Sequence, residues 1–137
     1  MNEVFVDTSG WANAFVKTEP YHITASTLLT QRKQQNRRVV TTNYVLSELV
    51  SLFVRMGVPR KSGLNYIEVL RTSDWVEIVH INESLDEKAW LLLANRLDKD
   101  WSLVDAVSFV VMQEHKMTEA LTADHHFEQA KFVCLLK

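Results

Sequence analysis

The sequence predicts an α/β fold, a three-layer α/β/α sandwich whose central sheet is mostly parallel and has about five strands. Two observations lead to this fold class. Short apolar and β-branched runs alternate along the chain with longer segments of helical periodicity. The short runs are largely apolar, which is typical of strands covered by helices on both faces. The 137 residues suit a single domain, 1–137, and three glycines with two prolines leave no room for a flexible linker.

Five short segments have the composition of strands. The first, Val4-Phe5-Val6, is wholly apolar and is followed at once by Asp7. The others are rich in Val, Ile, Leu or Ala, and polar or turn-forming residues bound most of them. The predicted strands are 4–6, 38–41, 75–81, 120–123 and 132–136.

The segments between the strands carry apolar residues three or four positions apart, as helices with one buried face do. Pro20 and Pro59 stand where helices begin, Thr42 or Asn43 is a suitable cap for another, and Gly57 is its stop. The predicted helices are 11–17, 20–36, 43–56, 59–71, 83–97, 103–115 and 125–130.

The helix predicted from Leu103 onward is the most informative segment. Ser102 is a good N-cap, and Asp105 three residues later completes a variant capping box with Asp in place of Glu. From Leu103 to Met112 this helix is apolar on nearly every side, so we expect it to be buried. A carboxylate in its first turn is costly to bury unless it caps the helix or a cation pairs with it.

Four carboxylates in four separate segments are predicted to face one edge of the sheet. Asp7 and Asp124 directly follow the first and fourth predicted strands, and ligand sites form at the carboxyl ends of parallel strands. Glu48 lies in the first half of the helix that follows the second strand. Asp105 joins them if its helix packs as a crossover, antiparallel to the strands. Taken singly, each acid is explained by a turn, a helix cap or a solvated helix face.

A cluster of this kind has a chemical consequence. Neighbouring carboxylates raise each other's pKa unless a cation is bound. An all-oxygen ligand set favours Mg²⁺ or Mn²⁺, and such an ion lowers the pKa of its water and stabilises charge on a phosphoryl oxygen. Asp7, Glu48, Asp105 and Asp124 are therefore the candidate residues for metal-assisted phosphodiester hydrolysis.

Composition limits the remaining classes of function. A formal net charge of −2 excludes a globally basic nucleic-acid binder, although eight of the fifteen Lys and Arg residues lie between Arg32 and Arg71. The one cysteine, Cys134, is expected in the core; it cannot form an intrachain disulfide, which fits a reducing cytoplasm. No signal peptide or membrane-spanning run is visible, so we expect no membrane partner.

The chain resembles the PIN-domain family in four places: Val-Phe-Val-Asp7-Thr-Ser, the mid-chain Glu48, Trp-Ser-Leu-Val-Asp105-Ala and Leu-Thr-Ala-Asp124-His-His-Phe. The resemblance covers essentially the whole chain and is closest to VapC-type toxin ribonucleases of prokaryotic type II toxin–antitoxin pairs. It implies that the four acids hold Mg²⁺ or Mn²⁺ and that the protein is an endoribonuclease that cuts single-stranded or loop RNA. It also implies a small antitoxin protein as partner and a homodimer.

Three residues have smaller expected roles, and one departs from the family pattern. Thr8 and Thr122 stand where the family often has hydroxyls near the site. Trp11 is expected in the core or at an interface, and it is a candidate for antitoxin contact. Lys131 precedes the aromatic Phe132 where many members have Gly, a departure that touches a turn and not the chemistry.

His125 and His126 are possible metal ligands by residue type. Adjacent residues do not share a helix face, however, so we expect surface positions for them, with His125 close to the site because it follows Asp124.

Other functions fit less well or stay open. A phosphotransferase of the haloacid dehalogenase type needs Asp-x-Asp after the first strand, whereas this chain has Asp7-Thr-Ser. A response-regulator receiver needs neighbouring acids at the first strand and a late lysine, and neither is evident. An RNA-processing PIN nuclease without an antitoxin stays open. A catalytically inert PIN-like RNA-binding module is the non-enzyme alternative, although such modules usually lack some of the four acids.

Overall fold

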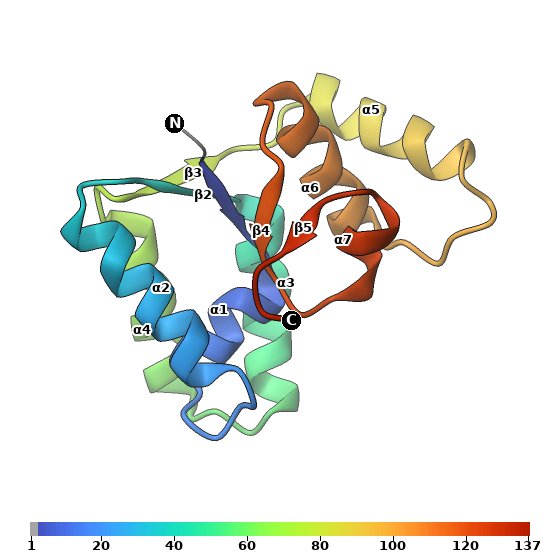
Figure 1. The fold of residues 1–137 in the computed structure, drawn as a ribbon. Helices are drawn as coiled ribbons and strands as arrows, with labels where there is room; N and C mark the ends of the chain where they lie inside the picture. Colours follow the sequence, from blue (N-terminus) through green and yellow to red (C-terminus); the bar gives the residue numbers. More distant parts are fainter. Residues whose placement is uncertain (1–2) are drawn as a thin grey trace.

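The computed structural model describes residues 3–137, and Figure 1 shows their path. A five-stranded sheet lies at the centre, with strand order β3-β2-β1-β4-β5 and every neighbouring pair parallel. The strands are β1 (Val4–Val6), β2 (Val39–Thr42), β3 (Val76–Val79), β4 (Glu119–Leu121) and β5 (Val133–Cys134). The helices are α1 (Thr8–Phe15), α2 (His22–Gln34), α3 (Asn43–Arg55), α4 (Arg60–Thr72), α5 (Glu83–Ala94), α6 (Leu103–Glu114) and α7 (His125–Gln129). The predicted fold class is confirmed.

β1 is the middle strand of the sheet. All three of its residues are inaccessible to solvent, so both of its faces are covered. β2 pairs with one side of β1, with Val39 opposite Val4, and β4 pairs with the other side, with Ala120 opposite Phe5. Because the strands all run in the same direction, the segments that follow β1, β2 and β4 leave the sheet at the same edge.

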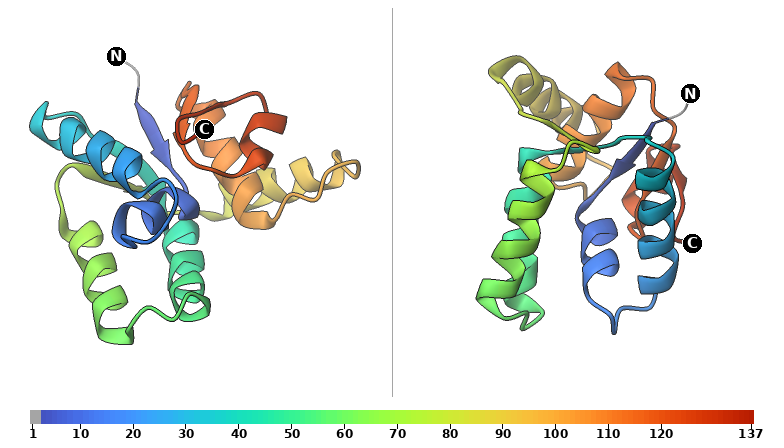
Figure 2. Two further views of the ribbon diagram at one scale, coloured as in Figure 1. Left: turned by 60° about the horizontal axis from the view of Figure 1, so that its bottom comes forward. Right: turned by 90° about the vertical axis from the view of Figure 1, so that its left-hand side faces the viewer.

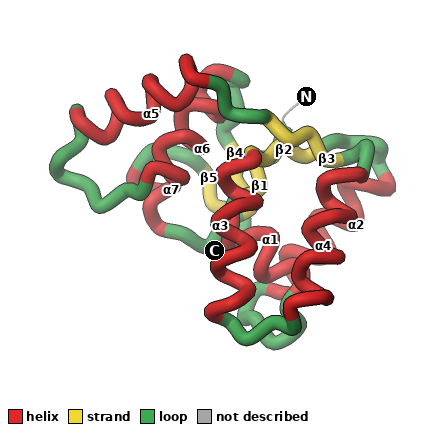
Figure 3. The backbone as a smooth tube through the Cα atoms, turned by 180° about the vertical axis from the view of Figure 1, so that it is seen from behind, coloured by secondary structure: helices red, strands yellow, loops and turns green. Residues whose placement is uncertain are grey.

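The helices pack in two connected groups around this sheet. α3 contacts α1, α4 and α6, and α5 packs chiefly on α6. Figure 3 shows α3 between α6 and α4, and Figure 2 shows α5 on the outside of the molecule, away from α2. α6 is buried continuously from Asp105 to Met112, as its apolar sequence predicts. Within residues 3–137, no helix is both long enough and apolar enough to cross a bilayer.

Several predicted boundaries are wrong, each for a local reason. α1 begins at Thr8 and not at Trp11, because Asp7 caps the helix directly after β1. α2 begins at His22, because Pro20 lies in a turn that is closed by a hydrogen bond from the His22 N–H to the Glu19 carbonyl.

Two elements end earlier than predicted. β4 stops at Leu121, since the Ala123 N–H donates to a side chain instead of a strand, and α5 stops at Ala94, which leaves Leu97 exposed.

Four helices, α2, α3, α6 and α7, end in the same hydrogen-bonded motif. In α7 the Lys131 N–H donates to the Glu128 carbonyl and the Phe132 N–H to the Phe127 carbonyl, both at 3.0 Å, with Lys131 at positive φ. The corresponding positive-φ residues of the other three are Asn36, Gly57 and Lys116. Lys131 therefore stands at a position that favours glycine, so the departure from the family pattern affects only this helix end.

Gly10 allows α1 to lie directly against β4. A Cβ atom at this position would lie 2.2 Å from the carbonyl oxygen of Leu121 and 2.9 Å from Cγ1 of Val6. The carbonyl belongs to the backbone of a central strand and is not free to move aside. This close approach brings Asp7, at the end of β1, next to Thr122, at the end of β4.

We predict that Gly10→Ala lowers the free energy of unfolding by roughly 2 kcal/mol, because overpacking outweighs the gain in helix propensity of about 1 kcal/mol. Urea denaturation measures the change. Ser62→Ala, at an exposed position of α4, is the control and should shift stability by less than about 0.5 kcal/mol. An unchanged midpoint for Gly10→Ala would show that α1 moves off β4 without penalty.

Candidate active site

Asp7 is the most constrained of the candidate residues. It links β1 to α1 and is buried, with 6% of its surface exposed. Its Oδ1 accepts hydrogen bonds from the Gly10 N–H and the Ser9 hydroxyl, each at 2.9 Å. Its Oδ2 accepts the Thr122 hydroxyl at 2.8 Å. Both carboxylate oxygens are thus fixed by segments that leave β1 and β4.

The environment of Asp7 disfavours its charge. Burial raises the pKa of this carboxyl from 3.8 to about 7, although the hydrogen bonds from Gly10, Thr122 and Ser9 act in the opposite direction. The negative charge of Asp124 raises the pKa further. Near neutral pH, Asp7 therefore takes up a proton readily unless a cation lies against it.

Asp105 makes the capping box that the sequence predicts. Its N–H donates to the Ser102 Oγ at 3.1 Å, and its Oδ2 accepts the Ser102 N–H at 3.1 Å. The same Oδ2 lies 3.0 Å from Nδ1 of His126. Burial is the main cause that raises the pKa of Asp105; the charge of Asp124 adds to it, while the Ser102 N–H and His126 oppose it.

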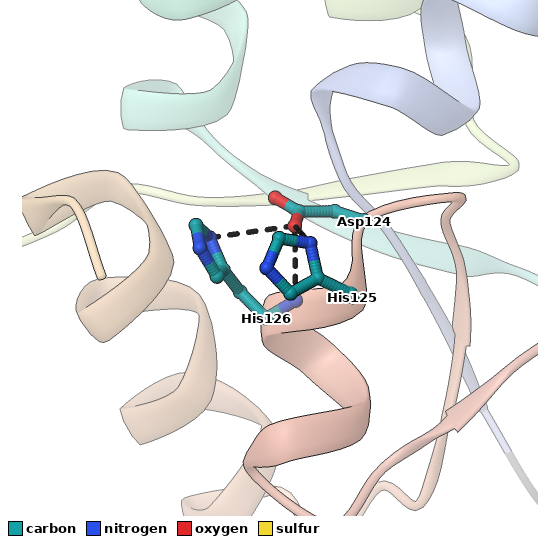
Figure 4. Close-up of side chains that lie close together, drawn as sticks. All are labelled: Asp124, His125 and His126. Carbon is teal, nitrogen blue, oxygen red and sulfur yellow. Dashed lines mark hydrogen bonds and ion pairs between the residues drawn. The ribbon is translucent and has the colours of Figure 1, made fainter. Parts of the chain in front are cut away.

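Asp124 caps α7 at the same edge of the sheet. Its Oδ1 accepts the backbone N–H of His126 at 2.9 Å. This oxygen also lies 3.3 Å from Nδ1 of His126 and 3.7 Å from Nδ1 of His125. Figure 4 shows both imidazole rings beside the carboxylate. The Asp124 N–H donates to the Thr122 Oγ1 at 2.9 Å, so Thr122 connects Asp124 to Asp7.

Glu48 reaches this edge from α3. It is half-buried, and its Oε1 accepts the Thr8 hydroxyl at 2.5 Å. Because Thr8 follows Asp7 in the chain, this bond ties Glu48 to the end of β1. Glu48 also lines a groove of about 540 Å³ together with Leu103 and Val104, the two residues before Asp105. The groove therefore runs between α3 and the start of α6.

The structure thus brings all four predicted acids to the carboxyl edge of the sheet. The charge of Asp124 acts on both Asp7 and Asp105, and Glu48 is tied to the end of β1 by its hydrogen bond from Thr8. The resemblance gives Thr8 and Thr122 only minor roles. In the structure, Thr8 bonds Glu48, and Thr122 bonds both Asp7 and Asp124.

Sequence reasoning missed the contribution of Ser9. Its hydroxyl donates to Asp7 and accepts the N–H of Ala123 at 3.0 Å, which ties α1 to the segment after β4. The residue stands in a helix that begins earlier than predicted, so its neighbours were not foreseeable. The signal available was a hydroxyl two residues after a strand-terminal Asp.

Two other expectations are wrong. His126 is not a surface residue: 20% of its side chain is exposed, against 65% for His125, and it lies between Asp105 and Asp124. Trp11 is fully buried, and its indole N–H donates to the Thr41 Oγ1 at 3.2 Å. Of the two positions expected for Trp11, the core is therefore confirmed, and the antitoxin contact is wrong.

By residue type the four acids suit a hard divalent cation, although within residues 3–137 no three of them form a group whose donor atoms all lie within 4.8 Å of one another. The charged groups with the largest effects on the pKa values of Asp7 and Asp105 are Asp124 and His126. Four carboxylates are a ligand set that suits Mg²⁺ or Mn²⁺.

No protein-family model matches the chain. Two proteins of Mycobacterium tuberculosis, from strains CDC 1551 / Oshkosh and ATCC 25618 / H37Rv, are each 33% identical to it over 130 residues. The match covers 95% of this chain and 95% of each relative. Both relatives are described as the 23S rRNA-specific endonuclease VapC20.

A solved structure agrees with this similarity. The crystal structure of M. tuberculosis VapC20, described as a sarcin–ricin-loop-cleaving toxin, superimposes with a TM-score of 0.86 at 31% sequence identity. The superposition covers 96% of this chain and 97% of VapC20. Sequence and fold agree over nearly the full length of both proteins, and the predicted resemblance is confirmed: the chain belongs to the VapC family of PIN-domain toxins.

Proposed function

We propose that this VapC-family protein is a metal-dependent endoribonuclease that hydrolyses RNA phosphodiester bonds, and that it acts as the toxin of a type II toxin–antitoxin pair. The observation that carries the proposal is the convergence of Asp7, Glu48, Asp105 and Asp124 at one edge of the sheet. A buried carboxylate with a pKa of about 7 destabilises the folded chain when it is charged, so its presence favours a functional role.

Mg²⁺ or Mn²⁺ is the proposed cofactor, held by the four acids. When bound, such an ion supplies a water of lowered pKa and neutralises charge on a phosphoryl oxygen. The chain itself contributes orientation. Hydrogen bonds from Gly10, Ser9 and Thr122 already fix both oxygens of Asp7, which supports a site that needs little rearrangement on binding.

RNA is the proposed substrate, and the ribosomal RNA loop cut by VapC20 is the first to test. The groove beside Glu48 supports a path for the strand. Leu103 and Val104 provide an apolar surface suited to a base, and the exposed Arg55 at the α3 side of the groove is suited to a phosphate. Its other lining residues are Tyr44, Ser47 and Ser51.

The remaining partners are also proposals. We infer that a small antitoxin protein blocks the site, that the toxin forms a homodimer, and that it acts in the cytoplasm. Two large apolar side chains of α5, Trp90 and Leu91, are exposed and available for a protein contact. An RNA-processing nuclease without an antitoxin is the second candidate, and toxicity on overexpression, relieved by a neighbouring gene product, separates the two.

We predict that the purified protein cleaves RNA only with Mg²⁺ or Mn²⁺, and that Asp7→Asn and Asp105→Asn each reduce the cleavage rate by at least about a hundredfold. A gel assay on a radiolabelled RNA loop, with and without excess EDTA, measures this. Asp100→Asn, at an exposed position near Asp105 in the chain, is the matched control and should keep full activity. Full cleavage in EDTA, or by Asp7→Asn, would exclude the metal-dependent mechanism, whereas no cleavage with either metal would favour the inert binding module.

We predict that Asp7→Asn stabilises the metal-free protein at pH 8 by about 1–3 kcal/mol. The pKa of Asp7 is higher in the folded state than the unfolded value of 3.8, so its stabilising contribution is complete below pH 4 and is lost as pH rises to about 7. The amide carries no charge at any of these pH values. Thermal melts of both proteins in EDTA should differ at pH 8 and converge toward pH 4; equal melting temperatures at pH 8 would show that Asp7 is not strained by its burial.

We predict that Arg55→Gln raises the KM for RNA about fivefold and changes kcat by less than about twofold, because it removes a phosphate contact outside the acidic cluster. Lys116→Gln is the charge-matched control, because Lys116 follows the far end of α6 from Asp105 and should not alter KM. Equal KM values for Arg55→Gln and the unmodified protein would show that RNA does not bind in this groove.

A further inference from the structure

We propose that Asp124, His125 and His126 form a second metal position that takes a borderline transition metal of the Zn²⁺ class. This position contains nitrogen ligands, in contrast to the all-carboxylate set proposed for Mg²⁺ or Mn²⁺. The inference that this second metal inhibits cleavage rests on the proposed function. The inference that the metal binds does not depend on the proposed function.

The distances between the donor atoms suit a single ion. One ligand atom from each of Asp124, His125 and His126 lies within 4.8 Å of the others. Asp124 Oδ1 is 3.3 Å from Nδ1 of His126 and 3.7 Å from Nδ1 of His125. Ligands that sit about 2.1 Å from a common metal lie roughly 3.0–3.4 Å from each other, so small rotations of the two rings complete the geometry.

The local backbone explains why two adjacent histidines converge. Both stand at the start of α7, directly after the capping Asp124, whose Oδ1 also accepts the His126 N–H. Their ring centroids are 4.4 Å apart, and Figure 4 shows the two rings flanking the same carboxylate. The expectation that neighbouring residues point to different sides of a helix does not hold at this first turn.

Asp105 lies next to this group without belonging to it. Its Oδ2 is 3.0 Å from Nδ1 of His126, but it is not among the donor atoms that all lie within 4.8 Å of one another. Two imidazoles and one carboxylate match the three protein ligands of an open zinc site, in which water is the fourth ligand. The hard ion Mg²⁺ prefers oxygen ligands and gains little from imidazole.

Access to the position is open on one side. His125 is exposed over 65% of its side chain, so an ion can reach it from solvent without opening the core. His126 and Asp124 are 20% and 30% exposed and form the inner wall. The position therefore lies at the mouth of the acidic cluster.

Occupancy of this position conflicts with the proposed catalytic ion. An ion held by Asp124, His125 and His126 engages one of the four carboxylates proposed to hold Mg²⁺. Its positive charge, next to Asp105 through His126, also disfavours a second cation at the acidic cluster. Zn²⁺ should therefore inhibit Mg²⁺-supported cleavage by competing for Asp124.

The test is calorimetric titration of Zn²⁺ alone into the metal-free, full-length protein at pH 7.5. We expect one Zn²⁺ per chain, with affinity lowered at least about tenfold in His126→Ala and in His125→Ala. His115→Ala is the matched control, because this exposed histidine lies at the opposite end of α6 from Asp105. The visible absorption of Co²⁺ bound in place of Zn²⁺ gives a second readout, since nitrogen ligation and a tetrahedral geometry intensify its bands.

Equal Zn²⁺ affinity in the native protein and in a His125→Ala/His126→Ala double variant would place the ion on carboxylates alone and overturn the proposal. A loss of affinity in His115→Ala as large as in His126→Ala would overturn it as well. The binding arm needs no RNA, so it stands if the chain proves not to be a nuclease. In the cleavage assay, inhibition by micromolar Zn²⁺ should weaken in His125→Ala. Unchanged inhibition would overturn the claim that Zn²⁺ competes with the catalytic ion. The Zn²⁺ affinities alone decide whether the metal position exists.

Discussion

The structure of this site depends on the burial of one carboxylate, that of Asp7. The side chain ends β1, caps α1 and accepts hydrogen bonds from three donors, yet burial still raises its pKa to about 7. Hydrogen bonds therefore hold the group in place without compensating fully for its desolvation. The contacts that hold Asp7 also bring the end of β4 against the start of α1, so the geometry of the cluster follows from how this one group is accommodated.

The other acids are held by the rigid parts of the fold. Asp105 is locked into the first turn of α6, a helix buried from Asp105 to Met112, so its carboxylate has little freedom to turn away. Thr122 accepts one backbone N–H and donates to Asp7, which sets the distance between the segments after β1 and β4. Sites built on buried helices and strand ends position their ligands more accurately than sites on loops. This arrangement fits the membership of the chain in a family of endonuclease toxins.

His126 is the residue whose place changes the description of the site most. Its Nδ1 lies 3.0 Å from Oδ2 of Asp105 and 3.3 Å from Oδ1 of Asp124. It gives the cluster a nitrogen donor that a purely acidic set would lack, and His125 beside it adds a second. The polar groups at this edge are therefore of two kinds: the carboxylates of the four acids, and the imidazoles of His125 and His126 beside Asp124.

By itself, the sequence determined the fold class, the capping box of Ser102 and Asp105, the burial of α6 and the position of four acids near one edge of the sheet, because these rest on local periodicity and on the rule that parallel strands end at one edge. It did not determine that α1 starts at Thr8, that Trp11 lies in the core and not at an interface, or that Ser9 and His126 contact the acids. Those outcomes depend on contacts between segments far apart in the chain, such as Gly10 against Leu121 and His126 against Asp105. Only tertiary packing decides them, since a residue's own neighbours in sequence carry no record of which distant backbone it will meet.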